Sequence, residues 1–106
     1  NIQIDGYTEH VMPLENLKDK YESFNWHVVE IDGHNMQEIV DSAEYAKAVY
    51  EKPTCVIMHT VAGKGVDFME YDFHWHGKPP NPEEAAMALK ALRSLGGRIK
   101  SDSEAL

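Results

Sequence analysis

The chain has 106 residues, of which 42% are hydrophobic and 26% charged, the composition of an ordinary soluble protein and enough length for one small domain. Its formal net charge of -8 argues against a nucleic-acid partner, because phosphate backbones require a basic face. No apolar stretch approaches the roughly 20 residues that a membrane span needs. The single cysteine, Cys55, excludes an internal disulfide and agrees with a reducing compartment, so we expect a cytoplasmic protein with no membrane partner.

The N-terminal part is predicted to be an extended segment followed by a helix. Residues 2–6 alternate and close in an Asp5-Gly6 turn signal, and because no initiator Met precedes them we expect a fragment of a larger domain. Pro13 suits the first position of a helix, which ends at Asn25. The apolar stripe of that helix consists of Leu14, Leu17, Tyr21 and Phe24.

A strand and a second helix are predicted next. Residues 26–31 are rich in β-branched and aromatic side chains and stop at Asp32-Gly33. Asn35 with Glu38 three residues later predicts a capping box. The inner face of this helix would consist of Met36, Ile39, Val40, Ala43, Ala46 and Tyr50, and Lys52-Pro53 would end it.

The remaining elements are a buried strand, a long loop and a capped helix. Residues 54–60 form a near-continuous apolar run, typical of a strand covered on both faces. Asn81-Pro82 with Glu84 predicts a capped helix, and Gly96-Gly97 ends it. Its stripe consists of Ala85, Leu89, Leu92 and Leu95. We therefore expect a domain over residues 1–97 and a polar tail or linker over residues 98–106.

This alternation predicts the fold class: an α/β protein with a parallel, three-layer αβα sheet. Ligands of such sheets bind beyond the carboxyl ends of the strands, where the loop over residues 59–80 begins. That loop is too apolar to stay solvated, and long ordered loops in small domains are usually functional. Gly63 and Gly65 frame a turn whose amides, with Lys64, are expected to face an anion.

Four blocks of sequence match a known family: I-Q-I-D-G at 2–6, W-H-V-V-E-I-D-G-H-N at 26–35, K-P-T at 52–54, and G-K-G-V-D-F-M-E with W-H-G-K-P-P within 63–80. The chain resembles the thiamine-diphosphate-binding domain of transketolase, in particular the form in which this domain is a separate N-terminal subunit. The resemblance implies transfer of a two-carbon ketol unit from a ketose phosphate to an aldose phosphate, in the pentose phosphate pathway. It also implies thiamine diphosphate and Mg²⁺ as cofactors.

The same resemblance assigns site residues. The backbone carbonyl of Ile2 aligns with a ligand of the divalent cation, and Asn1 with the neighbour of a side-chain ligand or with that ligand itself. The family's Gly-Asp-Gly motif, which supplies the other metal ligand, does not occur in the sequence. His76 aligns with the histidine that reaches the diphosphate and the reacting sugar. The cofactor-binding positions implied by the resemblance are Ile4, Ala62, Gly63 and His76.

The implied partners are sugar phosphates, a pyrimidine-binding domain or C-terminal transketolase subunit, and a second copy in a dimeric assembly. Three alternatives stay open at this stage. In the first alternative, the complete protein is another thiamine-diphosphate enzyme, such as deoxyxylulose-phosphate synthase. Alternatively, His59, His74 and His76 belong to a zinc-binding module. Lastly, Phe68, Phe73 and Trp75 serve a non-catalytic scaffold as docking residues.

Overall fold

The computed structural model of the protein describes residues 1–96, so the predicted tail over residues 98–106 and Gly97 lie outside the described part. Two compact units are present: Leu14–Thr60 forms one, and Asn1–Pro13 with residues 61–96 forms the other. None of the helices within residues 1–96 is long and apolar enough to cross a membrane.

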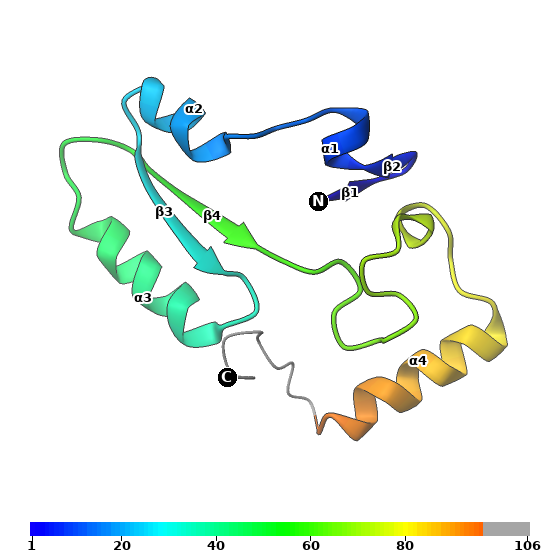
Figure 1. Ribbon diagram of the computed structural model, residues 1–106. Coiled ribbons are helices and arrows are strands. Elements are labelled where there is room, and N and C mark those ends of the chain that lie inside the picture. The colour runs from blue at the N-terminus through cyan, green and yellow to red at the C-terminus, as the bar shows by residue number, and fades with distance from the viewer. Residues whose placement is uncertain (97–106) are drawn as a thin grey trace. The chain divides into compact units, whose positions relative to one another are not determined.

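The unit over Leu14–Thr60 is built on a βαβ motif (Figure 1). Strand β3 (His27–Asp32) leads through helix α3 (Met36–Lys47) to strand β4 (Thr54–His59). The two strands are parallel and in register from the His27–Thr54 pair to the Asp32–His59 pair. The predicted α/β class with a parallel sheet is confirmed, and both strands lie within one residue of their predicted limits.

Helix α3 is tied to the end of β3 by its first turn. The Asn35 side chain accepts hydrogen bonds from the amides of Gln37 and Glu38, which confirms the Asn35 half of the predicted capping box. The Asn35 amide donates to the Asp32 carbonyl at 3.1 Å. The Glu38 carboxylate accepts from the Asp32 amide at 2.8 Å and from Nδ2 of Asn35 at 3.0 Å. Glu38 thus joins the helix to the strand as well as to its cap.

Most of the predicted inner face of α3 is wrong, because only Ile39 and Ala46 are half-buried and Ala43 is exposed. Met36, Val40 and Tyr50 are 65%, 56% and 92% exposed, whereas Ser42 is buried and its hydroxyl donates to the Ile39 carbonyl. The tie between Glu38 and the end of β3 accounts for this difference, because it turns positions 38, 39 and 42 toward the sheet. The buried stripe is therefore rotated from the one that hydrophobicity predicted.

Helix α2 (Leu17–Ser23) starts four residues later than predicted. Asn16 occupies the capping position in an extended conformation, and its side-chain amide donates to Asp19 at 2.9 Å, so Pro13 is not the first helical residue. Phe24, a predicted member of the stripe, is 80% exposed. Asn25 ends the helix as predicted, because its φ of 67° places it in the left-handed region.

The other unit begins with a tight hairpin. Strand β1 (Ile2–Gln3) pairs with β2 (Gly6–Tyr7) in antiparallel register, and helix α1 (Thr8–Val11) follows. The predicted extended piece with a turn signal at Asp5-Gly6 is part of this hairpin, in which Ile2–Gln3 is extended and the turn lies one residue earlier than predicted. The chain reverses at Ile4–Asp5, where the Gln3 side chain accepts from the Asp5 amide at 2.6 Å.

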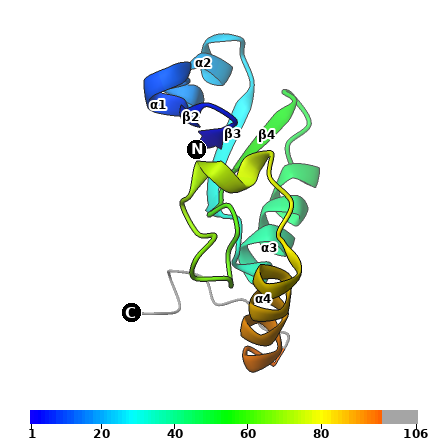
Figure 2. The ribbon, with the colours of Figure 1, turned by 90° about the vertical axis from the view of Figure 1, so that its right-hand side faces the viewer.

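The long loop of this unit ends in a short 3-10 helix, η1 (Phe73–His76), and an extended segment then leads to helix α4 (Pro82–Ser94) (Figure 2). The capping box of α4 is confirmed: the Asn81 side chain accepts from the Glu84 amide, and the Glu84 carboxylate accepts from the Asn81 amide, both at 2.8 Å. Gly96, with a φ of 59°, follows the last turn. In the predicted stripe, Ala85 and Leu95 are half-buried, but Leu89 and Leu92 are exposed.

Candidate functional site

The predicted site residues all belong to one of the two units, the one formed by Asn1–Pro13 and residues 61–96. Three of them lie in or beside the β1–β2 hairpin, two in the loop after β4, and one at the end of η1. In that order they are Asn1, Ile2 and Ile4; Ala62 and Gly63; and His76.

The hairpin register decides which way the Ile2 carbonyl points. Thr8 donates its amide to the Asn1 carbonyl at 2.9 Å, and the Thr8 hydroxyl reaches the same oxygen at 3.2 Å. Hydrogen-bonded and non-bonded pairs alternate along an antiparallel ladder. Ile2 and Tyr7 therefore form a non-bonded pair, and the Ile2 carbonyl is directed away from β2. The Asn1 carbonyl is hydrogen-bonded within the hairpin, whereas the Ile2 carbonyl faces outward.

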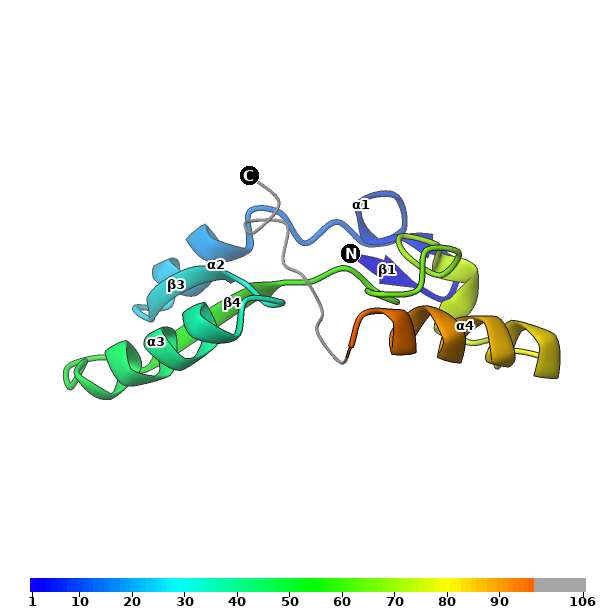
Figure 3. The ribbon, with the colours of Figure 1, turned by 90° about the horizontal axis from the view of Figure 1, so that it is seen from below.

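The hairpin packs against the segment that carries His76. Both β1 and β2 contact η1, which lies beside them in Figure 3. The Ile4 side chain comes within 4.0 Å of the point where a Cβ atom on Gly77 would lie. Ile4 is 64% exposed and His76 is exposed as well. The structure thus brings the Ile2–Ile4 segment and the His76–Gly77 segment together, although some 70 residues separate them.

The contact between hairpin and loop depends on Tyr7, a residue that belongs to none of the predicted site positions. Its hydroxyl donates to the Tyr71 carbonyl at 2.9 Å. Its ring meets that of Phe73 edge to face, with centroids 5.5 Å apart. Tyr71 has a φ of 60°, uncommon for a residue with a side chain. No local sequence signal predicts a bond between residues 64 positions apart.

Asp72 caps η1 and orients the neighbouring histidine. Its carboxylate accepts from the His74 amide at 3.0 Å and from Nδ1 of the His74 ring at 2.6 Å. The hydrogen bond from the His74 side chain, and then the one from its amide, lower the pKa of Asp72. Because Nδ1 donates, a neutral His74 keeps Nε2 as an acceptor. The His74 ring stacks on Phe73 at a centroid distance of 4.2 Å.

The glycine turn after β4 is closed by bonds within the chain. Lys64 donates its amide to the Val61 carbonyl at 3.2 Å, and Val66 donates to the Gly63 carbonyl at 3.1 Å. Gly65 donates to the Glu70 carboxylate at 2.9 Å. The amides of this turn were expected to face an anion, and the structure gives these three intramolecular acceptors instead. Ala62 is half-buried at the start of this turn.

A tryptophan closes the rest of the loop. Nε1 of Trp75 donates to the Phe68 carbonyl at 3.0 Å, and the two rings meet edge to face. Nζ of Lys78 lies 4.5 Å from the centre of the Trp75 ring and 3.3 Å from the Glu84 carboxylate. Lys78 therefore links Trp75 of η1 to Glu84 in the first turn of α4.

The family model for the thiamine diphosphate binding domain of transketolase matches residues 1–96. The chain belongs to this transketolase family. Among similar curated proteins is the 6-deoxy-6-sulfo-D-fructose transketolase subunit SqwG of a Clostridium species, 42% identical over 95 residues, or 90% of this chain and 34% of that protein. An apulose-4-phosphate transketolase subunit of Phocaeicola vulgatus is 36% identical over 99 residues, covering 93% and 34%. Transketolase 2 of Escherichia coli is 37% identical over 92 residues, covering 86% and 14%.

The chain thus spans about a third of the length of the transketolase subunits that it resembles. The family identifies the cofactor class as thiamine diphosphate. The hairpin fits a diphosphate cofactor that is bound through Mg²⁺. This cation takes oxygen ligands from a protein and from a diphosphate, and the outward-facing Ile2 carbonyl is such an oxygen. Within residues 1–96, no cluster of three or more His, Cys, Asp and Glu side chains is arranged to hold a metal ion. The zinc-module alternative gains no support from this part of the transketolase-family chain.

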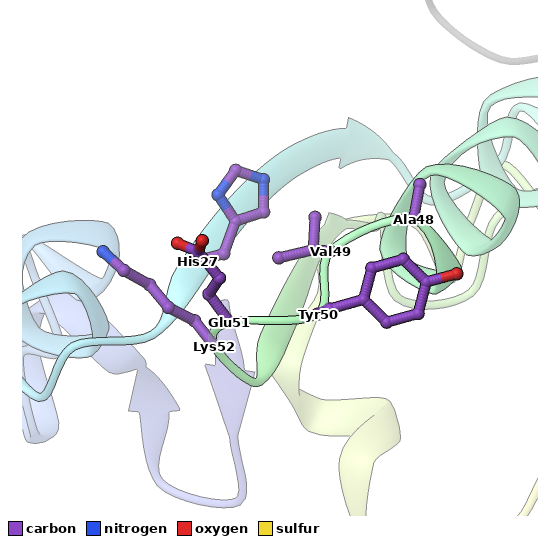
Figure 4. A pocket seen from close by; sticks show the side chains of 6 residues that line it. All are labelled: His27, Ala48, Val49, Tyr50, Glu51 and Lys52. Carbon is purple, nitrogen blue, oxygen red and sulfur yellow. The ribbon is translucent and has the colours of Figure 1, made fainter.

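Two pockets lie away from the predicted site. One, of about 390 Å³, is lined by His27, Ala48, Val49, Tyr50, Glu51 and Lys52 (Figure 4). His27 is the first residue of β3, so this pocket is at the amino end of the strand, opposite the edge where ligands were expected. The other, of about 420 Å³, is lined by Asp67, Phe68 and residues of α4. Neither pocket includes a predicted cofactor-binding residue of the transketolase family.

Proposed function

We propose that the full-length protein is a transketolase, which transfers a two-carbon ketol unit from a ketose phosphate to an aldose phosphate with thiamine diphosphate and Mg²⁺. The observation that carries this proposal is the packing of β1 against η1 in a chain whose residues 1–96 match the thiamine diphosphate binding domain. This packing supports a site in which the proposed cation ligand lies beside the proposed diphosphate and substrate ligand. Thiamine diphosphate supplies a carbon nucleophile to such reactions when it is bound.

Each site residue has a task in this proposal. The Ile2 carbonyl would be a ligand of Mg²⁺, and Asn1 would be a second ligand or the neighbour of one; Mg²⁺ bound there would supply positive charge to the diphosphate. An acidic domain can therefore hold an anionic cofactor. Ala62 and Gly63, in the loop after β4, would border the cofactor. Ile4 provides an apolar wall that keeps water from the reacting carbon.

His76 performs the proton chemistry. An imidazole near neutral pH can donate a hydrogen bond to a phosphate oxygen, and it can move a proton to or from a sugar hydroxyl. His76 is exposed at the end of η1 and next to Gly77, which faces Ile4. This location gives its ring access to a ligand bound along the hairpin edge.

The substrates and partners are also part of the proposal. Relatives are named for 6-deoxy-6-sulfo-D-fructose and for apulose-4-phosphate, both sugars with an anionic group. We propose sugar phosphates of the pentose phosphate pathway as the first substrates to test. The second set would be the two sugars for which these relatives are named. A pyrimidine-binding domain, on the same chain or on a C-terminal subunit, completes the site in a cytoplasmic dimeric assembly.

The test uses the full-length protein with its pyrimidine-binding partner, and compares the His76→Ala variant with Lys47→Ala as a control. Ketol transfer should fall by about 10²- to 10⁴-fold in His76→Ala and stay unchanged in Lys47→Ala, whose side chain is 72% exposed in the other unit. Near-normal turnover and cofactor affinity of His76→Ala would remove the assignment.

Calorimetry tests the cation. Thiamine diphosphate should bind with Mg²⁺ present, should lose most of its affinity after chelation by EDTA, and should regain it when Mg²⁺ is restored. No heat at a saturating cofactor concentration would instead favour the non-catalytic scaffold.

A further inference from the structure

Tyr7 makes two contacts with the loop from a single side chain. Its hydroxyl donates to the Tyr71 carbonyl at 2.9 Å, and its ring contacts the ring of Phe73 at an interplanar angle of 78°. Tyr7 is 38% exposed. One contact precedes η1 and the other lies on its first residue, so both ends of the junction between loop and helix are held from β2.

The backbone at the junction requires such an anchor. Tyr71 has a φ of 60°, in the left-handed region that residues with a Cβ atom rarely adopt. Conformations of this kind persist when surrounding contacts fix them. The carbonyl that receives the Tyr7 hydroxyl belongs to this residue, so the hydrogen bond favours the very conformation that turns the chain into η1.

The anchor extends to both halves of the proposed site. From Tyr71 the chain passes to Asp72, which accepts from the His74 amide and whose carbonyl accepts from Trp75 at 3.3 Å; His76 completes this turn. In the other direction Tyr7 lies opposite Ile2 in the hairpin. One residue therefore connects the proposed cation ligand with the proposed catalytic histidine.

We propose that Tyr7 is a positioning residue for ketol transfer, which sets the location of His76 relative to the Ile2 carbonyl through its hydroxyl bond to Tyr71. This inference rests on the proposed function of His76. It adds a residue that touches neither cofactor nor sugar and acts through η1. A displacement of about 1 Å of a catalytic group is enough to cost up to two orders of magnitude in rate.

The test compares Tyr7→Phe, which keeps the ring against Phe73 and removes the donor, with Tyr7→Leu, which removes both. In the full-length protein with its partner, kcat should fall about tenfold in Tyr7→Phe and further in Tyr7→Leu. The sugar KM and the dissociation constant of thiamine diphosphate should stay within about twofold in Tyr7→Phe. Tyr50→Phe, at a residue that is 92% exposed in the other unit, is the matched control and should leave kcat unchanged.

The outcomes separate this proposal from the function on which it rests. If His76→Ala loses activity but Tyr7→Phe turns over like the wild type, the Tyr7 proposal is overturned and the function stands. If Tyr7→Phe raised the sugar KM, lowered the affinity for thiamine diphosphate and lowered kcat by similar factors, Tyr7 would have a general structural role. That result would also overturn the Tyr7 proposal.

A second measurement does not require activity. Amide hydrogen exchange at residues 72–76 should be faster in Tyr7→Phe than in the wild type, with residues 27–32 unchanged. Unchanged exchange at η1 would overturn the positioning role even if no sugar were turned over.

Discussion

Gly63 lies directly against the backbone of Met69 in the loop that follows β4. A Cβ atom at Gly63 would come within 2.8 Å of both the Cβ and the carbonyl oxygen of Met69. Gly63 also has a φ of 74°, a left-handed conformation. Two independent constraints, one of conformation and one of space, therefore require glycine at a residue proposed to border the cofactor.

The first prediction follows from these two constraints. Gly63→Ala should lower the free energy of unfolding by about 2–5 kcal/mol, the sum of a left-handed penalty of about 1–2 kcal/mol and an overpacking cost of about 1–3 kcal/mol. Gly96→Ala is the control, because Gly96 has a φ of 59° but no atom lies within 4 Å of the point that its added Cβ would occupy. Urea unfolding of the full-length variants measures both. Equal costs would show that Met69 moves aside and that the close approach is unimportant.

The second prediction concerns the capping box of α4. Asn81→Ala removes the acceptor of the Glu84 amide, so the free energy of unfolding should fall by about 1 kcal/mol. Glu83→Ala is the control, because Glu83 is an exposed residue of the same turn outside the reciprocal box. Thermal and urea unfolding measure the difference. A Glu83→Ala variant as destabilised as Asn81→Ala would mean that first-turn charge, and not the cap, stabilises the helix.

The third prediction concerns closure of the loop by Trp75. Trp75→Phe keeps a ring beside Phe68 but removes the indole N–H that donates a hydrogen bond to the Phe68 carbonyl. A hydrogen bond worth about 0.5–1.5 kcal/mol corresponds to roughly a 2- to 12-fold rise in local opening. Cleavage after Lys64 by a lysine-specific protease should therefore accelerate by about that factor. Trp26→Phe, in the other unit, is the control; equal rates in wild type and Trp75→Phe would contradict the prediction.

Local signals in the sequence predicted local structure. The caps at Asn35 and Asn81 and the left-handed stop at Asn25 depend on residues within a few positions of one another, so they could be identified in advance. The parallel pairing of β3 and β4 was predicted from the alternation of strands with amphipathic helices. The rotation of α3 could not be predicted, because it depends on the bond between Glu38 and the Asp32 amide.

The candidate site was predicted through the family resemblance, and its internal geometry required the structure. The W-H-G-K-P-P block indicated His76, but no periodicity or spacing shows that η1 packs on β1. The bond between Tyr7 and Tyr71 likewise depends on tertiary structure. The glycine turn shows the opposite case: the motif was recognised, yet the acceptor of the Gly65 amide is the Glu70 carboxylate.

The last prediction concerns pH. The hydrogen bonds from the His74 ring and amide hold the pKa of Asp72 below its ordinary value of 3.8. A carboxyl whose pKa is lower in the folded state stabilises it above the unfolded value, and this contribution disappears as pH falls through the folded pKa. The contribution of Asp72 to the cap of η1 should therefore be present above about pH 4 and weaken below that. An NMR titration of the Asp72 carboxyl carbon should give a midpoint below 3.8, and His74→Ala should raise it by removing the ring donor. Asp72→Asn should keep the acceptor for the His74 amide and abolish the acid transition; a midpoint that does not respond to His74→Ala would contradict this account.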